Sequence, residues 1–158
     1  SKLLDFIKDR LYGIFDEINP SVIKACIASG ENDLLLLSKA IKALGEIAAA
    51  ADFGENFATF KRLANIIKDE KIGVVDENLF EHDAERALNA AFRAIKLNEN
   101  DVSGYLRSLF GLKGVIDNFF DNVMINVQGV KIRANRIANI GQIYRAFLQF
   151  ADIKEIGF

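Results

Sequence analysis

Residues 37–51 read LSKAIKALGEIAAAA, and this stretch decides the fold class. Its apolar side chains recur three or four positions apart, which places them on one face of an α-helix. The members of this stripe are Leu37, Ala40, Ile41, Leu44, Ile47, Ala48 and Ala51. Alanine and leucine are also among the strongest helix formers. The stretch therefore predicts a helix that starts near Asn32 and ends before a break at residues 52–54.

The same helical spacing recurs on both sides of this segment. We expect further helices over residues 2–18, a short one from 20 to 30, then 55–69, 83–97, a shorter one from 102, 113–124 and 130–150, with a turn near 78–80. Asn19 and Pro20 fit the N-cap and first helical position of the second helix, and Gly30 fits the left-handed residue after its end. The polar stretches 71–76 and 98–101 are typical of loops.

Composition agrees with a single helical domain. The chain has 158 residues, of which 51% are apolar and 27% charged, and Pro20 is its only proline. These values suit one soluble globular domain. No stretch alternates apolar and polar residues as a half-buried strand does. The sequence predicts an all-α fold, a single irregular bundle of seven to eight helices over residues 1–158.

Charge and cysteine content leave the partner open. The formal net charge is −2, which neither demands nor excludes a nucleic acid. No apolar run reaches the roughly 18 residues of a membrane span, and no signal-peptide pattern opens the chain, so we expect no membrane partner. Cys26, the only cysteine, lies among apolar residues and reads as a core thiol, which fits a reducing cytoplasm. Because Met124 is the only methionine, we expect the chain to be part of a longer protein.

Residues for catalysis are missing from the sequence. His82 is the only histidine, whereas a metal hydrolase needs several ligands that converge on one site. The dipeptide His82-Asp83 resembles that of metal phosphohydrolases, but the further histidines are absent, and a polar start of the fifth helix is the simpler interpretation. Neither a glycine-rich phosphate loop nor a nucleophile elbow is present. We therefore expect no catalytic site, no metal and no cofactor in this domain.

Two stretches are basic and free of acids, at residues 56–68 and 122–151. Such surfaces attract phosphates, and asparagine side chains can read base edges in unpaired RNA. The candidates for RNA contact are Lys61, Arg62, Asn65, Lys68, Lys131 and Asn135. The basic residues would hold phosphates and the two asparagines would hydrogen-bond bases. The alternative is a solvated helix face with no ligand.

Arg133 and Arg136 lie toward the apolar side of the last predicted helix. A buried guanidinium needs an acidic partner. Asp117 and Asp121, four residues apart on the preceding helix, are the candidates, so we favour structural ion pairs among these four residues over contact of the two arginines with RNA.

Several segments, in order along nearly the whole chain, resemble one family. They are LLDFIKDRL at 3–11, KRLANIIK at 61–68, FFDNVMINV at 119–127, RANRI at 133–137 and FLQFADI at 147–153. Together they resemble the C-terminal anticodon-binding domain of the bacterial glycyl-tRNA synthetase β subunit, a domain similar to the anticodon-binding domain of arginyl-tRNA synthetase. One departure is the stretch 127–130, VQGV, where the family usually has acids, so any contact made through those acids has no counterpart here.

This resemblance implies a role in translation. The parent enzyme would be a cytoplasmic α2β2 glycine–tRNA ligase, a class II aminoacyl-tRNA synthetase. ATP-dependent glycine activation, with magnesium, would belong to the α subunit. The C-terminal part of the β subunit would recognise the anticodon of tRNA-Gly, with the rest of the β subunit and the α subunit as its protein partners.

Two other functions remain open at this point. The first is a helical protein-interaction or scaffold module that binds no nucleic acid. It predicts no salt-dependent tRNA binding by the chain. The second is a metal hydrolase, which predicts a bound metal that is lost in His82→Ala.

Overall fold

The computed structural model describes residues 1–157, and within them it contains eight α-helices, two short 3₁₀-helices and no strand. The elements are α1 Lys2–Ile14, α2 Pro20–Ala28, α3 Leu34–Ala48, α4 Phe53–Ile67, η1 Glu77–Leu79, α5 Asp83–Arg93, α6 Val102–Phe110, α7 Lys113–Asn122, α8 Val130–Leu148 and η2 Ile153–Glu155. The predicted all-α bundle is confirmed. None of the described helices is long and apolar enough to cross a membrane.

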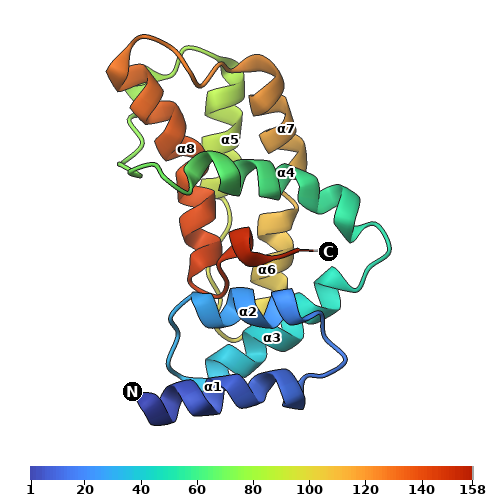
Figure 1. The fold of residues 1–158 in the computed structure, drawn as a ribbon. Helices are drawn as coiled ribbons and strands as arrows, with labels where there is room; N and C mark the ends of the chain where they lie inside the picture. Colours follow the sequence, from blue (N-terminus) through green and yellow to red (C-terminus); the bar gives the residue numbers. More distant parts are fainter. Residues whose placement is uncertain (158) are drawn as a thin grey trace.

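The helices form two groups that a crossing helix joins (Figure 1). The helices α1, α2 and α3 lie together at one end, with α1 packed on α2 and α2 packed on α3. At the other end α5 packs against both α7 and α8. The helix α4 runs across the middle and contacts α7 and α8. One side of α4 is therefore committed to packing, and its other side is left for solvent or a ligand.

Local chemistry sets the ends of α2 as the sequence predicts. The Asn19 side chain accepts a hydrogen bond from the Ser21 amide at 2.9 Å, and Pro20 takes the first helical position. Gly30 has a φ of 84°, a left-handed conformation that suits glycine after a helix end. The thiol of Cys26 is buried in this helix, and burial raises its pKa to about 12. Cys26 is therefore a core residue.

Three predicted helices are clearly shorter in the structure: the third spans Leu34–Ala48 instead of about 32–51, and two others end four residues early. The first ends at Ile14 instead of 18, and the fifth ends at Arg93 instead of 97. In these two cases apolar residues beyond the helix end still pack on the core, because Phe15 is buried at the C-cap of α1 and Ile95 packs from the turn after α5. The spacing of apolar residues reflects which side chains face the core. It therefore continues beyond the last hydrogen bond of the helix.

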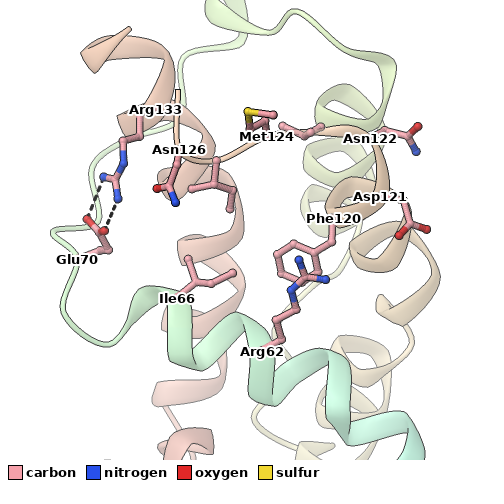
Figure 2. A pocket seen from close by; sticks show the side chains of 11 residues that line it. Arg62, Ile66, Glu70, Phe120, Asp121, Asn122, Met124, Asn126 and Arg133 are labelled. Carbon is pink, nitrogen blue, oxygen red and sulfur yellow. Dashed lines mark hydrogen bonds and ion pairs between the residues drawn. The ribbon is translucent and has the colours of Figure 1, made fainter. Parts of the chain in front are cut away.

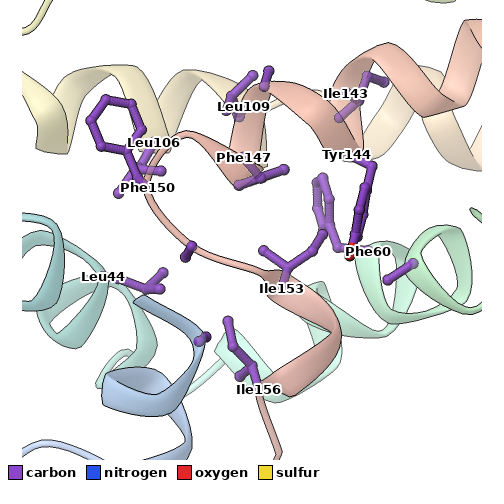
Figure 3. Close-up of a cluster of buried hydrophobic side chains, with 14 of the residues drawn as sticks. Leu44, Phe60, Leu106, Leu109, Ile143, Tyr144, Phe147, Phe150, Ile153 and Ile156 are labelled. Carbon is purple, nitrogen blue, oxygen red and sulfur yellow. The ribbon is translucent and has the colours of Figure 1, made fainter. Parts of the chain in front are cut away.

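An aromatic cluster joins α4, α6 and α8 at the centre. Phe147 lies with its ring centroid 5.6 Å from that of Phe60 and 4.9 Å from that of Phe110. Ile153 and Ile156 of the C-terminal segment lie against the same cluster (Figure 3). Hydrogen bonds from the side chains of Asn19 and Ser21 to the Gly157 carbonyl fix the end of this segment on α2. One side of α4 therefore packs on this core, and the opposite side is exposed.

Candidate nucleic-acid interface

The exposed face of α4 carries a row of polar and basic side chains. Lys61, Arg62, Asn65 and Lys68 are all exposed, while Phe57, Phe60, Leu63, Ala64 and Ile67 on the opposite face are buried. This orientation follows from the helical spacing of the buried set. In the described part of the chain none of the three basic residues forms an ion pair. The Lys61 side chain donates one hydrogen bond, to the Ile156 carbonyl at 3.3 Å.

A groove of about 650 Å³ adjoins this row (Figure 2). Arg62 and Ile66 of α4 form one side, Phe120 of α7 forms another, and the segment 123–126 closes the top. The guanidinium carbon of Arg62 lies 4.3 Å from the centroid of the Phe120 ring, which is a cation–π contact. The groove thus combines apolar walls with a cation held flat against an aromatic ring.

Arg133 and Glu70 form the remaining wall of the groove. Two guanidinium nitrogens of Arg133 donate to the two Glu70 carboxylate oxygens at 2.6 and 3.3 Å, a bidentate pair. The hydrogen bond from Arg133 holds the pKa of Glu70 below its ordinary value. Glu70 is therefore ionised at neutral pH, and its charge is compensated inside the groove wall.

The predicted partners of Arg133 and Arg136 are wrong, although both arginines do form ion pairs. Arg133 pairs with Glu70, and Arg136 contacts Glu81 at 2.9 Å and Glu85 at 3.3 Å. The physical reason is the packing of α8, whose first turns lie against α5 and the loop after α4. Arg136 also donates to the Met124 carbonyl at 2.6 Å, so it ties the segment above the groove to α5 and α8.

The acids of α7 face other directions than predicted. Asp117 accepts hydrogen bonds from Thr59 of α4 and from Lys113, both at 2.6 Å. Partial burial, the largest single effect, raises the pKa of Asp117, but the hydrogen bonds from Lys113 and Thr59 and the positive charges of Lys113 and Arg62 together lower it by more, so the net shift is downward. Asp121 is exposed and its carboxylate points away from the groove in Figure 2. Neither acid therefore reaches an arginine of α8.

The two candidates on α8 have different surroundings. Lys131 is exposed in the first turn of α8, so it remains a candidate for phosphate contact. Asn135 is buried, and its amide accepts from the Asp76 backbone N–H at 2.7 Å and donates to the Asp76 carbonyl at 3.0 Å. The expectation that this amide faces RNA bases is not met, because it anchors the loop after α4 instead. Helical spacing alone could not show that a loop would cover this face.

His82 is the N-cap residue of α5 and is exposed. The groups of histidine, cysteine and carboxylate side chains in residues 1–157 include none that could hold a metal ion. Glu85 accepts hydrogen bonds from the backbone amides of Glu81 and His82, which caps this helix start. His82 thus stands where the simpler interpretation of the sequence put it.

Two groove residues were not among the candidates from sequence. Phe120, the second residue of the stretch FFDNVMINV, is half-buried and supports Arg62. Asn126 is exposed, points into the groove and makes no hydrogen bond in the described part of the chain. Asn126 lies in the acid-free stretch 122–151, so the sequence does place it in a candidate RNA-binding segment. Nothing in the sequence alone signals that Phe120 would stand beside Arg62.

Taken together, the fold and the site define an all-helical chain with a basic helix face and an adjoining groove. The chain matches no family model. Over 98% of its length it is similar to part of the glycine–tRNA ligase β subunit of Myxococcus xanthus, at 32% identity, and of Geotalea uraniireducens, at 33%. Over 86% of its length it is 36% identical to the subunit of the same name from Streptococcus suis. The chain spans about a quarter of the length of these relatives, between 20% and 24%.

Proposed function

We propose that this chain is the corresponding region of a glycine–tRNA ligase β subunit and that it holds the anticodon arm of tRNA-Gly. The similarity to β subunits extends over almost the whole chain, which supports the first half. The exposed row on α4 supports the second half. Its basic side chains form no ion pair in the described residues, although Asp117 attracts Arg62, and such cations are available to phosphates.

The proposal assigns this chain binding and not chemistry. Glycine activation with ATP and magnesium would take place on the α subunit of an α2β2 enzyme in the cytoplasm. The chain would contribute by orienting the tRNA, since holding a substrate in place lowers the cost of a reaction at a distant centre. Its partners would be tRNA-Gly, the rest of the β subunit and the α subunit.

The exposed face of α1 favours a second role, as a protein-interaction module. Leu3, Phe6 and Ile14 lie on one side of this helix and are 70%, 59% and 65% exposed. An apolar stripe of this kind often marks a surface that another protein covers. Since the chain spans about a quarter of its relatives, the remaining β subunit is the occupant we propose. Figure 1 shows α1 at the far end from the α7–α8 connection, so both roles fit one chain.

A titration separates the two roles. The 158-residue chain is titrated with tRNA-Gly and with a tRNA-Gly whose anticodon is replaced, each at two salt concentrations. Anticodon binding predicts weaker binding of the altered tRNA and an affinity that falls as salt rises. A purely protein-binding module predicts no salt-dependent binding of either tRNA, and that outcome would exclude the RNA role.

A further inference from the structure

The groove beside α4 has the features of a pocket for a flat polar ring. Its volume of about 650 Å³ lies within the range of roughly 300–1,000 Å³ that is typical of ligand clefts. Ile66, Val123, Met124 and Ile125 supply apolar walls. Met124 is 68% exposed, although its neighbour Val123 is buried. A ligand in the groove would cover this methionine.

The Arg62 guanidinium offers a planar surface at the side of the groove. One of its faces lies on Phe120, and the exposed side chain also lines the cavity. A guanidinium held flat in this way can stack a second ring on its free face, since arginine planes stack on bases as aromatic side chains do. Phe120 keeps the plane in position before a ligand arrives, which reduces the entropy cost of binding.

Six of the eleven residues that line the groove are polar or charged, namely Arg62, Glu70, Asp121, Asn122, Asn126 and Arg133, and the amide of one of them is free among the described residues. Arg133 and Glu70 satisfy each other, and the Asp121 carboxylate points away in Figure 2. The Asn126 amide points into the groove and has no partner in the described residues. An amide offers one acceptor and two donors, which match the edge of an unpaired base.

A second hollow continues from the groove along α4. Its lining includes Lys61 and Asn65, and it shares Arg62 and Ile66 with the groove. Lys68 lies one turn further on and is exposed. A nucleotide in the groove would therefore leave its phosphates beside unpaired cations.

From this geometry we propose that the groove binds one unpaired base of an RNA loop. The base stacks on the free face of Arg62, and its polar edge meets the Asn126 amide. This inference rests on the proposed RNA-binding function and makes it specific, because it states which groups touch a base and which touch the backbone.

The test uses the 158-residue chain and the anticodon stem-loop of tRNA-Gly. Stem-loops with one abasic anticodon position each are titrated against the parent, Arg62→Lys and Asn126→Ala. Arg62→Lys keeps the charge but loses the planar stack. Arg107→Lys and Asn100→Ala are the matched controls, because both residues are exposed and lie outside the groove. Circular dichroism confirms that each variant is folded.

Stacking predicts that Arg62→Lys weakens binding of the intact stem-loop about tenfold with an unchanged salt dependence. Removing one particular base should weaken binding to the parent chain but have little further effect on Arg62→Lys, as expected for two groups in contact. Asn126→Ala should weaken binding and reduce the preference for that base. The two controls should bind as the parent does.

Two results would overturn the inference in different ways. If Lys68→Ala weakens binding while Arg62→Lys and Asn126→Ala bind as the parent does, the RNA role stands and the groove is not the base site. If the parent chain binds no stem-loop, or binds it without regard to the anticodon, the proposed function fails and the base site fails with it.

Discussion

Arg136 joins three parts of the molecule through one guanidinium. It is 3% exposed, and its partners are the Glu85 carboxylate, which is fully buried, the Glu81 carboxylate and the Met124 carbonyl. Burying a charge is unfavourable unless it is paired and hydrogen-bonded, and this network meets both conditions. The carbonyl belongs to the segment that closes the groove, so a structural residue also shapes the candidate site.

Replacing Arg136 tests this network. Arg136→Met should lower the free energy of unfolding by about 3–5 kcal/mol, because Glu85 would keep a buried charge without a cation. Urea unfolding followed by circular dichroism measures the change. Arg133→Met is the matched control and should lower the free energy of unfolding far less, since its pair with Glu70 is partly exposed. Equal unfolding midpoints for Arg136→Met and the parent would show that the buried pair contributes nothing.

At the scale of elements, several side chains of α8 hold the loop after α4: Arg133 pairs with Glu70, Arg145 donates to the Ile72 carbonyl at 2.9 Å, and Asn135 binds Asp76. The Asn135 amide binds both the N–H and the carbonyl of Asp76, in the manner of a backbone ladder. The loop that it fixes contains Glu70 at its start, and Glu70 forms a wall of the groove. The Asn135 amide therefore holds the loop and is not free to bind a ligand.

We expect Asn135→Ala to loosen this loop without direct loss of an RNA contact. The Asp76 amide loses its acceptor, so its hydrogen exchange should accelerate, while amides in α1–α3 keep their rates. Exchange followed by NMR measures both. Unchanged exchange at Asp76 would mean that the two hydrogen bonds do not hold the loop.

The sequence predicts the helices well because each buries one face of its own. The stripe that starts at Leu37 is buried from Leu37 to Ile47, as its spacing indicates. The site is predicted only in part, because it depends on contacts between distant segments. Helical spacing exposes Lys61 and Lys68 correctly, but it could not show that the 71–76 loop covers Asn135. Neither could it show that Arg62 meets Phe120, 58 residues further along the chain.

The aromatic core predicts a large cost for truncating one ring. Phe147 is 1% exposed and contacts rings from α4 and α6, so Phe147→Ala should lower the free energy of unfolding by about 3–5 kcal/mol. Thermal or urea unfolding measures it. Phe6→Ala is the control, and we expect almost no change because that ring lies on the exposed stripe of α1. A melting shift near zero for Phe147→Ala would contradict the placement of α8 in the core.

At the scale of the whole molecule, the positions of the charged side chains matter more for RNA binding than their sum. A net charge of −2 would weakly repel RNA, yet the basic side chains of the row on α4 form no ion pair in the part of the chain that the structure describes. Ion pairs such as Lys24 with Glu155 and Arg93 with Glu77 do not involve this row. A local field of this kind decides where a phosphate backbone binds.

Lys68 tests this arrangement, because its side chain is exposed and makes no hydrogen bond in residues 1–157. Lys68→Ala should weaken tRNA-Gly binding and lower the slope of log affinity against log salt by about 1, as one phosphate contact is lost. Lys39→Ala, on α3, is the control and should leave the slope as it is. An unchanged slope for Lys68→Ala would remove Lys68 from the interface.

The most direct test of RNA binding through α4 is a chemical-shift map. The isotope-labelled chain is titrated with the anticodon stem-loop of tRNA-Gly, and its backbone amides are followed by NMR. Binding at the proposed surface predicts shifts concentrated in residues 61–68 and 120–126, with α1 unchanged. Shifts confined to α1 and α2, or no shift at any residue, would contradict it.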